Sequence, residues 1–520
     1  MTIELSIGSE EQIHPSQPCD LSQTKPQNGF PSRAVLPLVS ACLLITFSCG
    51  IGQSSYARDF VVACTETASD ENEGTVESPL RTIGAAIRAA EPGDVVSVLA
   101  GDYRSEENGF GVGVIPVTNS GAFKNPIRIK AAANNDVIVG KFLLSNCHDI
   151  VIEGFQVRGL DFSTIEGWQP MPNIVRNPNA NLPRPDFTQP FETRETQIRE
   201  EFATYFSLVE QLDFTTGIDL ENCQRVNVFG NDIRGYFGGV QCRGCSQIKI
   251  HFNVIRDCTN GIFTFYASDG TTPGVIGASI RYNDIQQSLD NGIDIRAGSE
   301  AVQIDDNYVA FSGRSHISLQ GAATRCKVQY NAALRGGFYS ETMEFPGSSG
   351  ISLNDAGPSN TVLRNYVALQ QDLTGIDGNG IIIDFLREDA QAVVDGNISF
   401  CNAGAGLNLT ASPGNLIRRN IFAFNGHLST ESRRGAGIKI SRDQDIDNTI
   451  VNNFLFANRA AGLLSSGTIG AQENVDRNLY LTTGEPLIWD GFDIGDREYR
   501  TLMEVQAITG WERRGAALVW

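Results

Sequence analysis

The sequence predicts an all-β fold in which parallel strands stack as a solenoid, and two repeated patterns carry this prediction. In the first, an asparagine recurs every 22 to 34 residues with an apolar residue three positions before it. Its copies are Asn231, Asn253, Asn283, Asn307, Asn331, Asn365, Asn397, Asn420, Asn453 and Asn478. In the second, a Gly–aliphatic segment of alternating pattern begins within these intervals, as at 292 and 350. Such alternation indicates strands, and a repeat of this length indicates a solenoid.

Each repeat is predicted to form one coil, which is too small to bury its own apolar face. Coils stacked about 4.8 Å apart form parallel sheets with Ile, Val and Leu inside. The recurring asparagine is expected at one turn, where it tolerates unusual backbone angles and bonds to its copies in adjacent coils. These asparagines are therefore predicted to be structural rather than catalytic.

Both open ends of such a stack need covers. Residues about 78–91 have the pattern of an amphipathic capping helix, with Ile83 on its apolar side and Pro92 at its end. Residues about 497–513 are also helical in pattern and are expected to close the C-terminal end. The solenoid is thus predicted to span 58–520 as one domain.

Residues 1–57 are predicted to be a leader that directs export. An apolar run at 34–52 is followed by Ser55 and Ala57, which fit the small-residue rule for signal-peptide cleavage after Ala57. The run is also long enough for a membrane anchor, and the leader before it carries acidic residues. Both alternatives place the solenoid outside the cytoplasm, as a secreted, periplasmic or cell-surface domain.

One face of the solenoid is expected to bind the ligand. Alternate residues of the Gly–aliphatic strands point outward and mix both charge signs, amides and aromatics, as a sugar-binding surface does. The candidates for substrate binding are Phe263, Phe265, Gln320, Asn354, Asp384 and Lys439. Insertions border these strands and are expected to form the walls of a groove. They lie at 161–213, 266–277, 335–349, 371–379 and 426–436.

Two adjacent coils hold the residues with the strongest case for catalysis. Arg296 and Arg314 suit the neutralisation of a substrate carboxylate. His316, expected at the rim of the face, stands where nearly every other copy has Gly and suits the base. Asp294 lies beside Arg296, so the alternative interpretation is a surface ion pair and a histidine without a role. The next candidate cluster consists of Lys439, Arg442 and Asp384.

The cap string P-L-R-T-I-x-x-A-I-x-x-A-x-P-G-D-x-V-x-V-x-x-G-x-Y, together with the Asn-bearing coils, resembles the right-handed parallel β-helix proteins of the pectate-lyase-like superfamily. The likeness covers about 74–515 and implies a right-handed, secreted β-helix. It implies no single activity, because the superfamily holds lyases, hydrolases, epimerases, esterases and adhesins. The strings at 295–298 and 317–320 also resemble I-R-x-G and I-S-x-K of the chondroitinase-B and alginate-lyase group. That group uses the lysine as the base, and Gln320 stands at its position here.

The composition narrows the partners. A formal net charge of −20 argues against nucleic acid, because phosphate backbones are bound by Lys and Arg. An acidic polysaccharide would need a local arginine cluster. We therefore expect a monomeric, exported polysaccharide-active protein, most simply a lyase or epimerase on a uronate-containing glycan. The alternatives are a glycoside hydrolase and a non-catalytic glycan-binding or cell-surface protein. Ca²⁺ is possible as a cofactor, although no loop concentrates enough oxygen ligands to name a metal site.

Three cysteines in matching strings, Cys147, Cys223 and Cys245, are expected to stack on neighbouring coils. Cα atoms about 4.8 Å apart lie within the range of a disulfide, and which two cysteines would pair stays open. Cys242 and Cys245 form a C-x-x-C string. Because Cys242 is an inward strand position, no metal site is predicted there.

Overall fold

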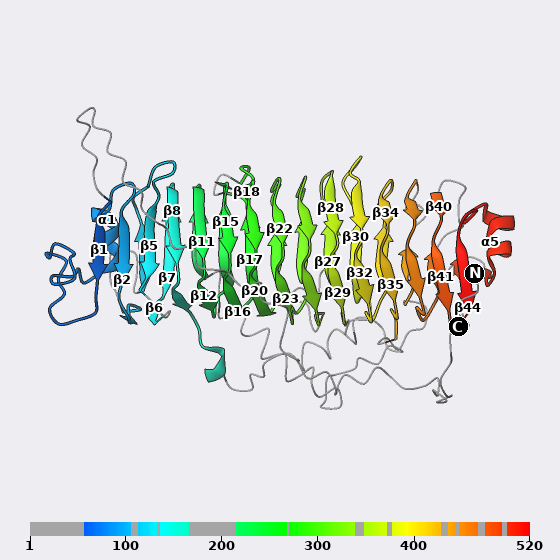
Figure 1. The fold of residues 1–520 in the computed structure, drawn as a ribbon, viewed down its shortest axis with the longest axis horizontal. Coiled ribbons are helices and arrows are strands. Elements are labelled where there is room, and N and C mark those ends of the chain that lie inside the picture. Colours follow the sequence, from blue (N-terminus) through cyan, green and yellow to red (C-terminus); the bar gives the residue numbers. More distant parts are fainter. Residues whose placement is uncertain are drawn as a thin grey trace, which may run out of the picture.

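A computed structural model describes the chain over 57–105, 113–132, 136–165, 193, 212, 215–267, 270–337, 348–371, 377–427, 435–441, 447–465, 474–490 and 497–519. These residues form an elongated stack of coils that runs from α1 (Ile83–Ala89) at one end to α5 (Leu502–Thr509) at the other (Figure 1). Each coil contributes one strand to each of three sheets in turn. The predicted all-β, right-handed parallel β-helix is confirmed. None of the helices in the described ranges is long and apolar enough to cross a membrane.

The first sheet, called sheet 1, holds the strands that precede the recurring asparagines, all paired in parallel. It consists of β1 (Asp59–Val62), β2 (Val95–Val98), β5 (Ile127–Ala131), β8 (His148–Glu153), β11 (Gln224–Phe229), β15 (Lys249–His251), β19 (Ser279–Arg281), β22 (Gln303–Asp305), β25 (Lys327–Gln329), β28 (Asn360–Leu363), β31 (Ala392–Asp395), β34 (Leu416–Arg418), β37 (Thr449–Val451) and β40 (Asn474–Asp476), with β14 (Cys245–Ser246) and β18 (Val275–Ile276) at its side.

The second sheet, called sheet 2, holds the strands that follow those asparagines. It consists of β3 (Gly101–Asp102), β6 (Val137–Val139), β9 (Gln156–Arg158), β12 (Asp232–Arg234), β16 (Val254–Cys258), β20 (Asp284–Ser288), β23 (Tyr308–Ala310), β26 (Ala332–Leu334), β29 (Tyr366–Ala368), β32 (Ile398–Phe400), β35 (Ile421–Ala423), β38 (Phe454–Phe456), β41 (Leu479–Thr482) and β44 (Ala516–Val519).

The third sheet, called sheet 3, holds the Gly–aliphatic strands. It consists of β4 (Val114–Val117), β7 (Lys141–Ser145), β10 (Thr216–Glu221), β13 (Gly238–Arg243), β17 (Asn260–Phe265), β21 (Ile293–Ile295), β24 (Ile317–Gln320), β27 (Ser349–Asn354), β30 (Asn379–Asp384), β33 (Leu407–Thr410), β36 (Ile438–Ile440), β39 (Leu463–Ser465), β42 (Ile488–Asp490) and β43 (Arg497–Tyr499). Only the β42–β43 pair is antiparallel among the paired strands of the described ranges.

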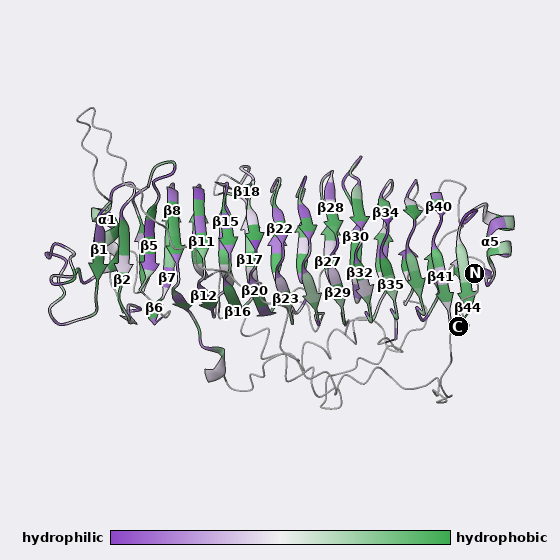
Figure 2. Ribbon diagram, viewed as in Figure 1, coloured by the Kyte–Doolittle hydropathy of each residue, from purple (hydrophilic) through white to green (hydrophobic). Residues whose placement is uncertain are grey.

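Hydrophobic and hydrophilic residues alternate along the strands (Figure 2). The apolar set faces inward, so that Ile262, Ile293 and Ile317 of successive sheet 3 strands are in register and fully buried. This continuous inner stack is the hydrophobic core, and it follows from the period-2 pattern of each short strand.

The recurring asparagines form a buried hydrogen-bonded ladder at the turn between sheets 1 and 2. Oδ1 of Asn253 accepts from the backbone N of Asn231 at 3.0 Å and from its Nδ2 at 3.1 Å. The same pair of bonds repeats at each step from Asn253 to Asn478. The last step ends on the carboxylate of Glu512, which accepts from N and Nδ2 of Asn478 at 3.0 and 2.7 Å.

Both ends of the stack are covered. Helix α1 is capped by Thr82, whose Oγ1 accepts from the backbone N of Ala85 at 3.2 Å. It is shorter than the predicted helix, because Leu80 instead bridges to Val62 of β1. At the C-terminal end, α5 has a capping box and is followed by β44, which adds a further strand to sheet 2. Residues 1–56, with the predicted cleavage signal and apolar run, lie outside the described residues.

Candidate functional site on sheet 3

The predicted site residues gather where β17, β21 and β24 lie side by side in sheet 3. Asp294 sits between the core residues Ile293 and Ile295, so its side chain lies on the opposite, outer face. It is nevertheless fully buried, and its neighbour in register, Phe263, is only 5% exposed. The expectation that this outer column is solvent-exposed is therefore wrong for these two residues.

Polar neighbours on the outer face enclose the Asp294 carboxylate. Arg296 forms an ion pair with its Oδ2, and Nε2 of Gln320 donates to its Oδ1 at 2.7 Å. Asn291 lies within 3.5 Å of Oδ2 through its Nδ2. A buried carboxylate needs such a set of donors, because burial without compensation is costly. The alternative interpretation of Asp294 and Arg296 as an ion pair is thus correct in geometry, although the pair is buried on the aspartate side.

A second carboxylate, missed in the sequence, lies next to this one. Nδ2 of Asn291 donates to Oδ2 of Asp290 at 3.0 Å, so the same amide contacts both aspartates. Asp290 is 6% exposed, and its Oδ1 is buried without a hydrogen-bond partner among the described residues. Burial raises the pKa of this carboxyl, opposed by the charge of Arg314 and reinforced by that of Asp294.

Arg314 is stacked on Asp290. The backbone N of Arg314 donates to the carbonyl of Asp290 at 3.0 Å, which places the two residues in one column of adjacent coils. The Arg314 side chain is half-buried, and no hydrogen bond or ion pair involves its guanidinium within the described part of the chain. A cation that lies near a buried acid but has no hydrogen bond or ion pair among the described residues is suited to bind a ligand carboxylate.

A signal in the sequence could have found Asp290. It occupies the position two residues before the glycine that opens each sheet 3 strand. Across the coils this position reads Thr215, Phe237, Thr259, Asp290, Arg314, Ser348, Gly378, Gly404, Gly435 and Ala460. Its only charged members are the stacked pair Asp290 and Arg314.

His316 does not lie at the rim of the face, so that prediction is wrong. Its side chain is fully buried, and Nε2 contacts the carbonyl oxygen of Leu334 at 2.9 Å while Nδ1 lies 3.2 Å from Nε2 of Gln370. Gly336 leaves the necessary space, since a Cβ there would come within 2.2 Å of the ring. Burial lowers the pKa of His316 to about 4. Because both ring nitrogens are occupied inside the stack, this geometry does not favour His316 as a base.

The predicted substrate-binding residues separate into three groups. Phe263 packs edge-on against Phe237 with centroids 5.8 Å apart, whereas Phe265 on the same strand is 47% exposed. The second group is Gln320, Asn354 and Asp384, which are in register on successive strands. Nδ2 of Asn354 donates to Oδ2 of Asp384 at 3.0 Å.

Lys439, the third group, is in register with Asn408 and stands in the other outer column, beyond β33 from Asp384. The structure therefore does not bring Lys439 and Asp384 together. Arg442 lies outside the described residues. So do most of the residues of the 161–213 insertion and the central parts of the insertions at 335–349, 371–379 and 426–436.

The predicted cysteine stack is present on the inner face. Cys147, Cys223 and Cys245 are buried and free. The neighbouring thiol of Cys223 and burial both raise the pKa of Cys147, which keeps it a protonated thiol. No group of three or more His, Cys, Asp or Glu side chains that could hold a metal occurs among the described residues.

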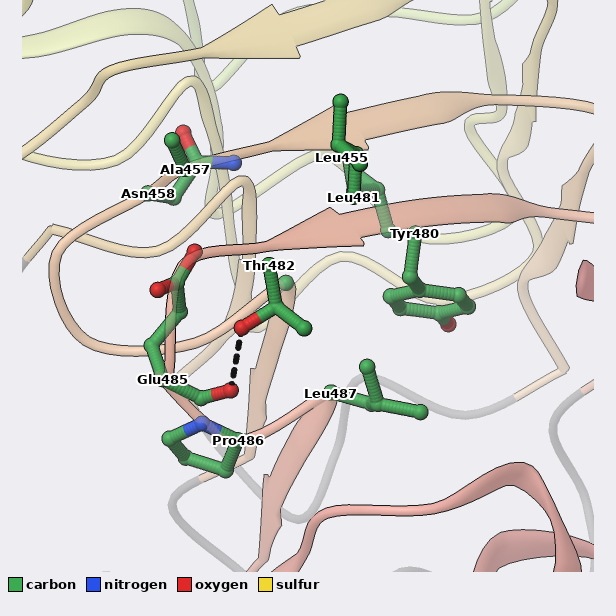
Figure 3. Close-up of a pocket in the computed structure, with 10 residues that line it drawn as sticks. Leu455, Ala457, Asn458, Tyr480, Leu481, Thr482, Glu485, Pro486 and Leu487 are labelled. Atoms are coloured by element: carbon green, nitrogen blue, oxygen red, sulfur yellow. Dashed lines mark hydrogen bonds between the residues drawn. The ribbon is translucent and has the colours of Figure 1, made fainter. Parts of the chain in front are cut away.

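A pocket between the last coils lies away from this site (Figure 3). It is lined by Leu455, Ala457, Asn458, Gly462, Tyr480, Leu481, Thr482, Glu485, Pro486 and Leu487. Thr482 closes one side by donating to the carbonyl oxygen of Glu485 at 2.6 Å. Its volume of about 10 Å³ is near that needed for one water molecule, so it is too small for a sugar.

Comparisons with known proteins agree with the fold. The family model described as periplasmic copper-binding protein (NosD) matches residues 204–378. The chain is a right-handed parallel β-helix protein. The cysteines in the matched region are inward-facing and surrounded by the apolar core, and the described residues offer no donor cluster of the kind that copper requires. The copper binding in the family's description therefore finds no fit in the residues described.

Other similar proteins match more distantly. An uncharacterised protein of Bacillus subtilis, YwoF, is 29% identical over 110 residues, which are 19% of this chain and 22% of that protein. The structure of XylC with xylose has a TM-score of 0.49 at 13% identity, covering 88% of this chain and 86% of the other. The A-module of the Azotobacter vinelandii mannuronan C-5 epimerase AlgE4 has a TM-score of 0.41 at 13% identity, covering 87% and 95%.

Proposed function

We propose that this chain is an exported, polysaccharide-active β-helix protein that acts as a lyase or epimerase on a uronate-containing glycan. The observation that carries the proposal is the unpaired, half-buried guanidinium of Arg314 stacked on the buried acid Asp290. Export rests on the leader pattern at 34–57.

Both reactions begin with removal of the proton α to the uronate carboxylate. Arg314 would bind that carboxylate and stabilise the negative charge that develops on it when the proton leaves. Asp290 would take the proton, because a buried carboxyl with a raised pKa is, once ionised, a stronger base than an ordinary aspartate. Arg296 and Gln320 would hold Asp294 in place beside them. A lyase then breaks the bond to the leaving oxygen, and an epimerase returns a proton from the other face.

The test follows removal of the α-proton, which both reactions share. The protein is incubated in D₂O with alginate, polygalacturonate and glycosaminoglycans. An epimerase places deuterium at the α-carbon, which NMR follows, and a lyase forms the unsaturated product, which ultraviolet absorbance follows. We expect one of these two signals with one of these glycans, and its loss in Arg314→Gln and Asp290→Asn. Arg335→Gln, which changes a half-buried arginine at the end of a sheet 2 strand, is the matched control. Absence of both signals with every uronate would overturn the proposal.

A non-catalytic glycan-binding protein is the second candidate, and the complete burial of Asp294 favours it. It predicts that one of the same glycans binds to the protein without exchange or cleavage. Binding that needs Arg314 but gives neither deuterium incorporation nor an unsaturated product would select this candidate over the enzyme.

A further inference from the structure

Exposed aromatic side chains are stacked at the turn between sheets 1 and 2, on a different part of the solenoid from the Arg314 site. Phe252 follows β15, Tyr282 follows β19, and their rings are stacked with centroids 4.9 Å apart. Phe229, at the end of β11, extends the row with a centroid distance of 5.3 Å to Phe252. Phe252 and Tyr282 are 51% and 49% exposed, so their outer faces are open to solvent.

The backbone at this position makes the choice of aromatics notable. The residue before each ladder asparagine is left-handed, with φ of 58° at Phe252 and 56° at Tyr282. Other coils place glycine there, at 230 and 396, or a polar residue, at 306, 364, 419, 452 and 477. A Cβ built on Gly230 meets nothing within 4 Å, so the position is open to solvent and no packing requires a large side chain. Neither burial nor backbone preference therefore accounts for the aromatic rings of Phe252 and Tyr282.

Cations flank the row on the outer face of sheet 1. Lys249 lies in the same coil as Phe252, and Lys327 lies in the same column, with two strands between them. Neither lysine forms a hydrogen bond or ion pair among the described residues. Arg281 pairs with Asp305 at 2.5 Å. Asp306 is the acid exposed nearby, so the surface is locally cationic on a chain with a net charge of −20.

The row continues beyond Asp306 with Tyr330, which is 46% exposed and also left-handed. Its hydroxyl accepts from Nη1 of Arg364 at 2.6 Å, and the guanidinium lies 5.8 Å from the ring centroid. With coils about 4.8 Å apart, the surface from Phe252 to Tyr330 extends roughly 14 Å along the stack.

We propose that this row, the aromatic ladder of Phe229, Phe252, Tyr282 and Tyr330 with Lys249 and Lys327, is a second binding site for an acidic polysaccharide. Sugar rings would stack on the aromatic faces, as flat apolar faces do, and the ring carboxylates would meet the two lysines. The chain's negative charge makes these cations the local attraction for a polyanion. The choice of ligand rests on the proposed function, since the substrate of the Arg314 site is the same class. The site would hold the glycan against the solenoid without taking part in its chemistry.

The test measures binding apart from turnover. Titration calorimetry with alginate, polygalacturonate and heparin fragments compares the unchanged chain with Phe252→Gly/Tyr282→Gly. Glycine suits the left-handed backbone, so the variant should fold. We expect a Kd about tenfold higher, the loss for two aromatic contacts, with the rate on short fragments unchanged. Phe424→Gly is the matched control, because Phe424 is also left-handed and 37% exposed but lies at another turn.

Charge is tested separately with Lys249→Gln/Lys327→Gln, whose affinity should fall and lose part of its salt dependence. An unchanged Kd in Phe252→Gly/Tyr282→Gly would overturn the aromatic ladder as a glycan-binding site. Self-association of the unchanged chain that disappears in that variant, without glycan binding, would overturn it in favour of a contact between copies. Absence of both deuterium incorporation and unsaturated product, with an intact effect on Kd, would instead reject only the proposed function.

Discussion

Two columns of one residue per coil show how this solenoid separates scaffold from function. In the ladder before sheet 2, each coil places an asparagine with the same bonds to the next coil. In the column before sheet 3, the residue is not held constant along the stack, and only Asp290 and Arg314 are charged. The asparagine ladder cannot vary because each side chain completes the hydrogen bonding of its neighbour. The side chains in the column before sheet 3 form no such repeated series of bonds among the described residues, so catalytic or binding residues can occur there.

The largest expected effect comes from breaking the ladder with Asn307→Ala. Oδ1 of Asn307 accepts from the backbone N and Nδ2 of Asn283, at 3.0 and 2.9 Å, and both donors are buried. Leaving two buried donors unpaired should lower the free energy of unfolding by about 4 kcal/mol. Chemical denaturation measures this loss, with Gln303→Ala on the exposed side of β22 as the control. A loss no greater than in the control would contradict the role of the ladder.

The second largest loss of stability is expected when Arg296 is removed from its ion pair with the buried Asp294. Arg296→Gln leaves the buried Asp294 carboxylate without its cation and should cost about 3 kcal/mol of stability. If Arg296 behaved as an ordinary residue of the outer face, its replacement would leave the free energy of unfolding almost unchanged. Chemical denaturation at neutral pH therefore distinguishes an ion pair that matters for stability from one that does not. Asp294→Asn/Arg296→Gln should recover much of the loss, because the uncompensated charge is then gone.

Arg314→Gln should lower the reaction rate far more than it lowers stability. The guanidinium makes no ion pair or hydrogen bond within the described residues, so stability should change by no more than about 0.5 kcal/mol. The rate of α-proton removal, followed as deuterium incorporation or as unsaturated product, should fall by roughly a hundredfold, as it does when an electrostatic stabiliser of a transition state is removed. Equal rates for Arg314→Gln and the unchanged chain would move the site elsewhere on sheet 3.

His316 should affect stability at acid pH rather than catalysis. Its folded-state pKa of about 4 lies below the usual 6.5, so the neutral form is favoured by folding. The stability it contributes is present above pH 6.5 and is lost as pH falls toward 4, at about 1.4 kcal/mol per pH unit. Relative to His316→Gln, the melting temperature of the unchanged chain should therefore fall on acidification. At neutral pH both proteins should turn over substrate at similar rates, and a large loss in His316→Gln would restore it as the base.

The smallest expected effect lies at the end of the ladder. Burial raises the folded-state pKa of Glu512 above its usual 4.5, so folding favours its protonated form. That contribution is present below pH 4.5 and is lost as pH rises through the folded-state pKa. The difference in melting temperature between the unchanged chain and Glu512→Gln should thus move in favour of the variant as pH rises. Movement in the other direction would mean that the bonds from Asn478 outweigh burial.

The sequence predicted the fold well because a solenoid repeats one local rule. The apolar residue before each asparagine fixed the sheets, and the Gly–aliphatic pattern fixed the strands of sheet 3. The site was predicted in part. Asp294, Arg296 and Gln320 do meet, because register follows from the repeat.

The burial of individual side chains could not be predicted from the sequence. His316 replaces a glycine, and only the space left by Gly336 on the next coil lets its ring turn inward. Asp290 was missed because it precedes the strand, where the repeat gives no rule for the direction of a side chain. Both outcomes depend on neighbouring coils, which a pattern within one coil does not contain.

The asparagine ladder also has a polarity. In each coil the asparagine backbone N and one Nδ2 hydrogen are satisfied by the coil that follows, while Nδ2 also donates to a carbonyl oxygen of the coil before, so a stack cut short exposes donors at its C-terminal end. Glu512, which is fully buried and accepts hydrogen bonds from Asn478 and Tyr480, acts as the terminator of this series. During synthesis from the N-terminus, the last folded coil would thus expose unpaired asparagine donors until Glu512 is added. Glu512, rather than any further asparagine, is what completes the hydrogen bonding of the ladder.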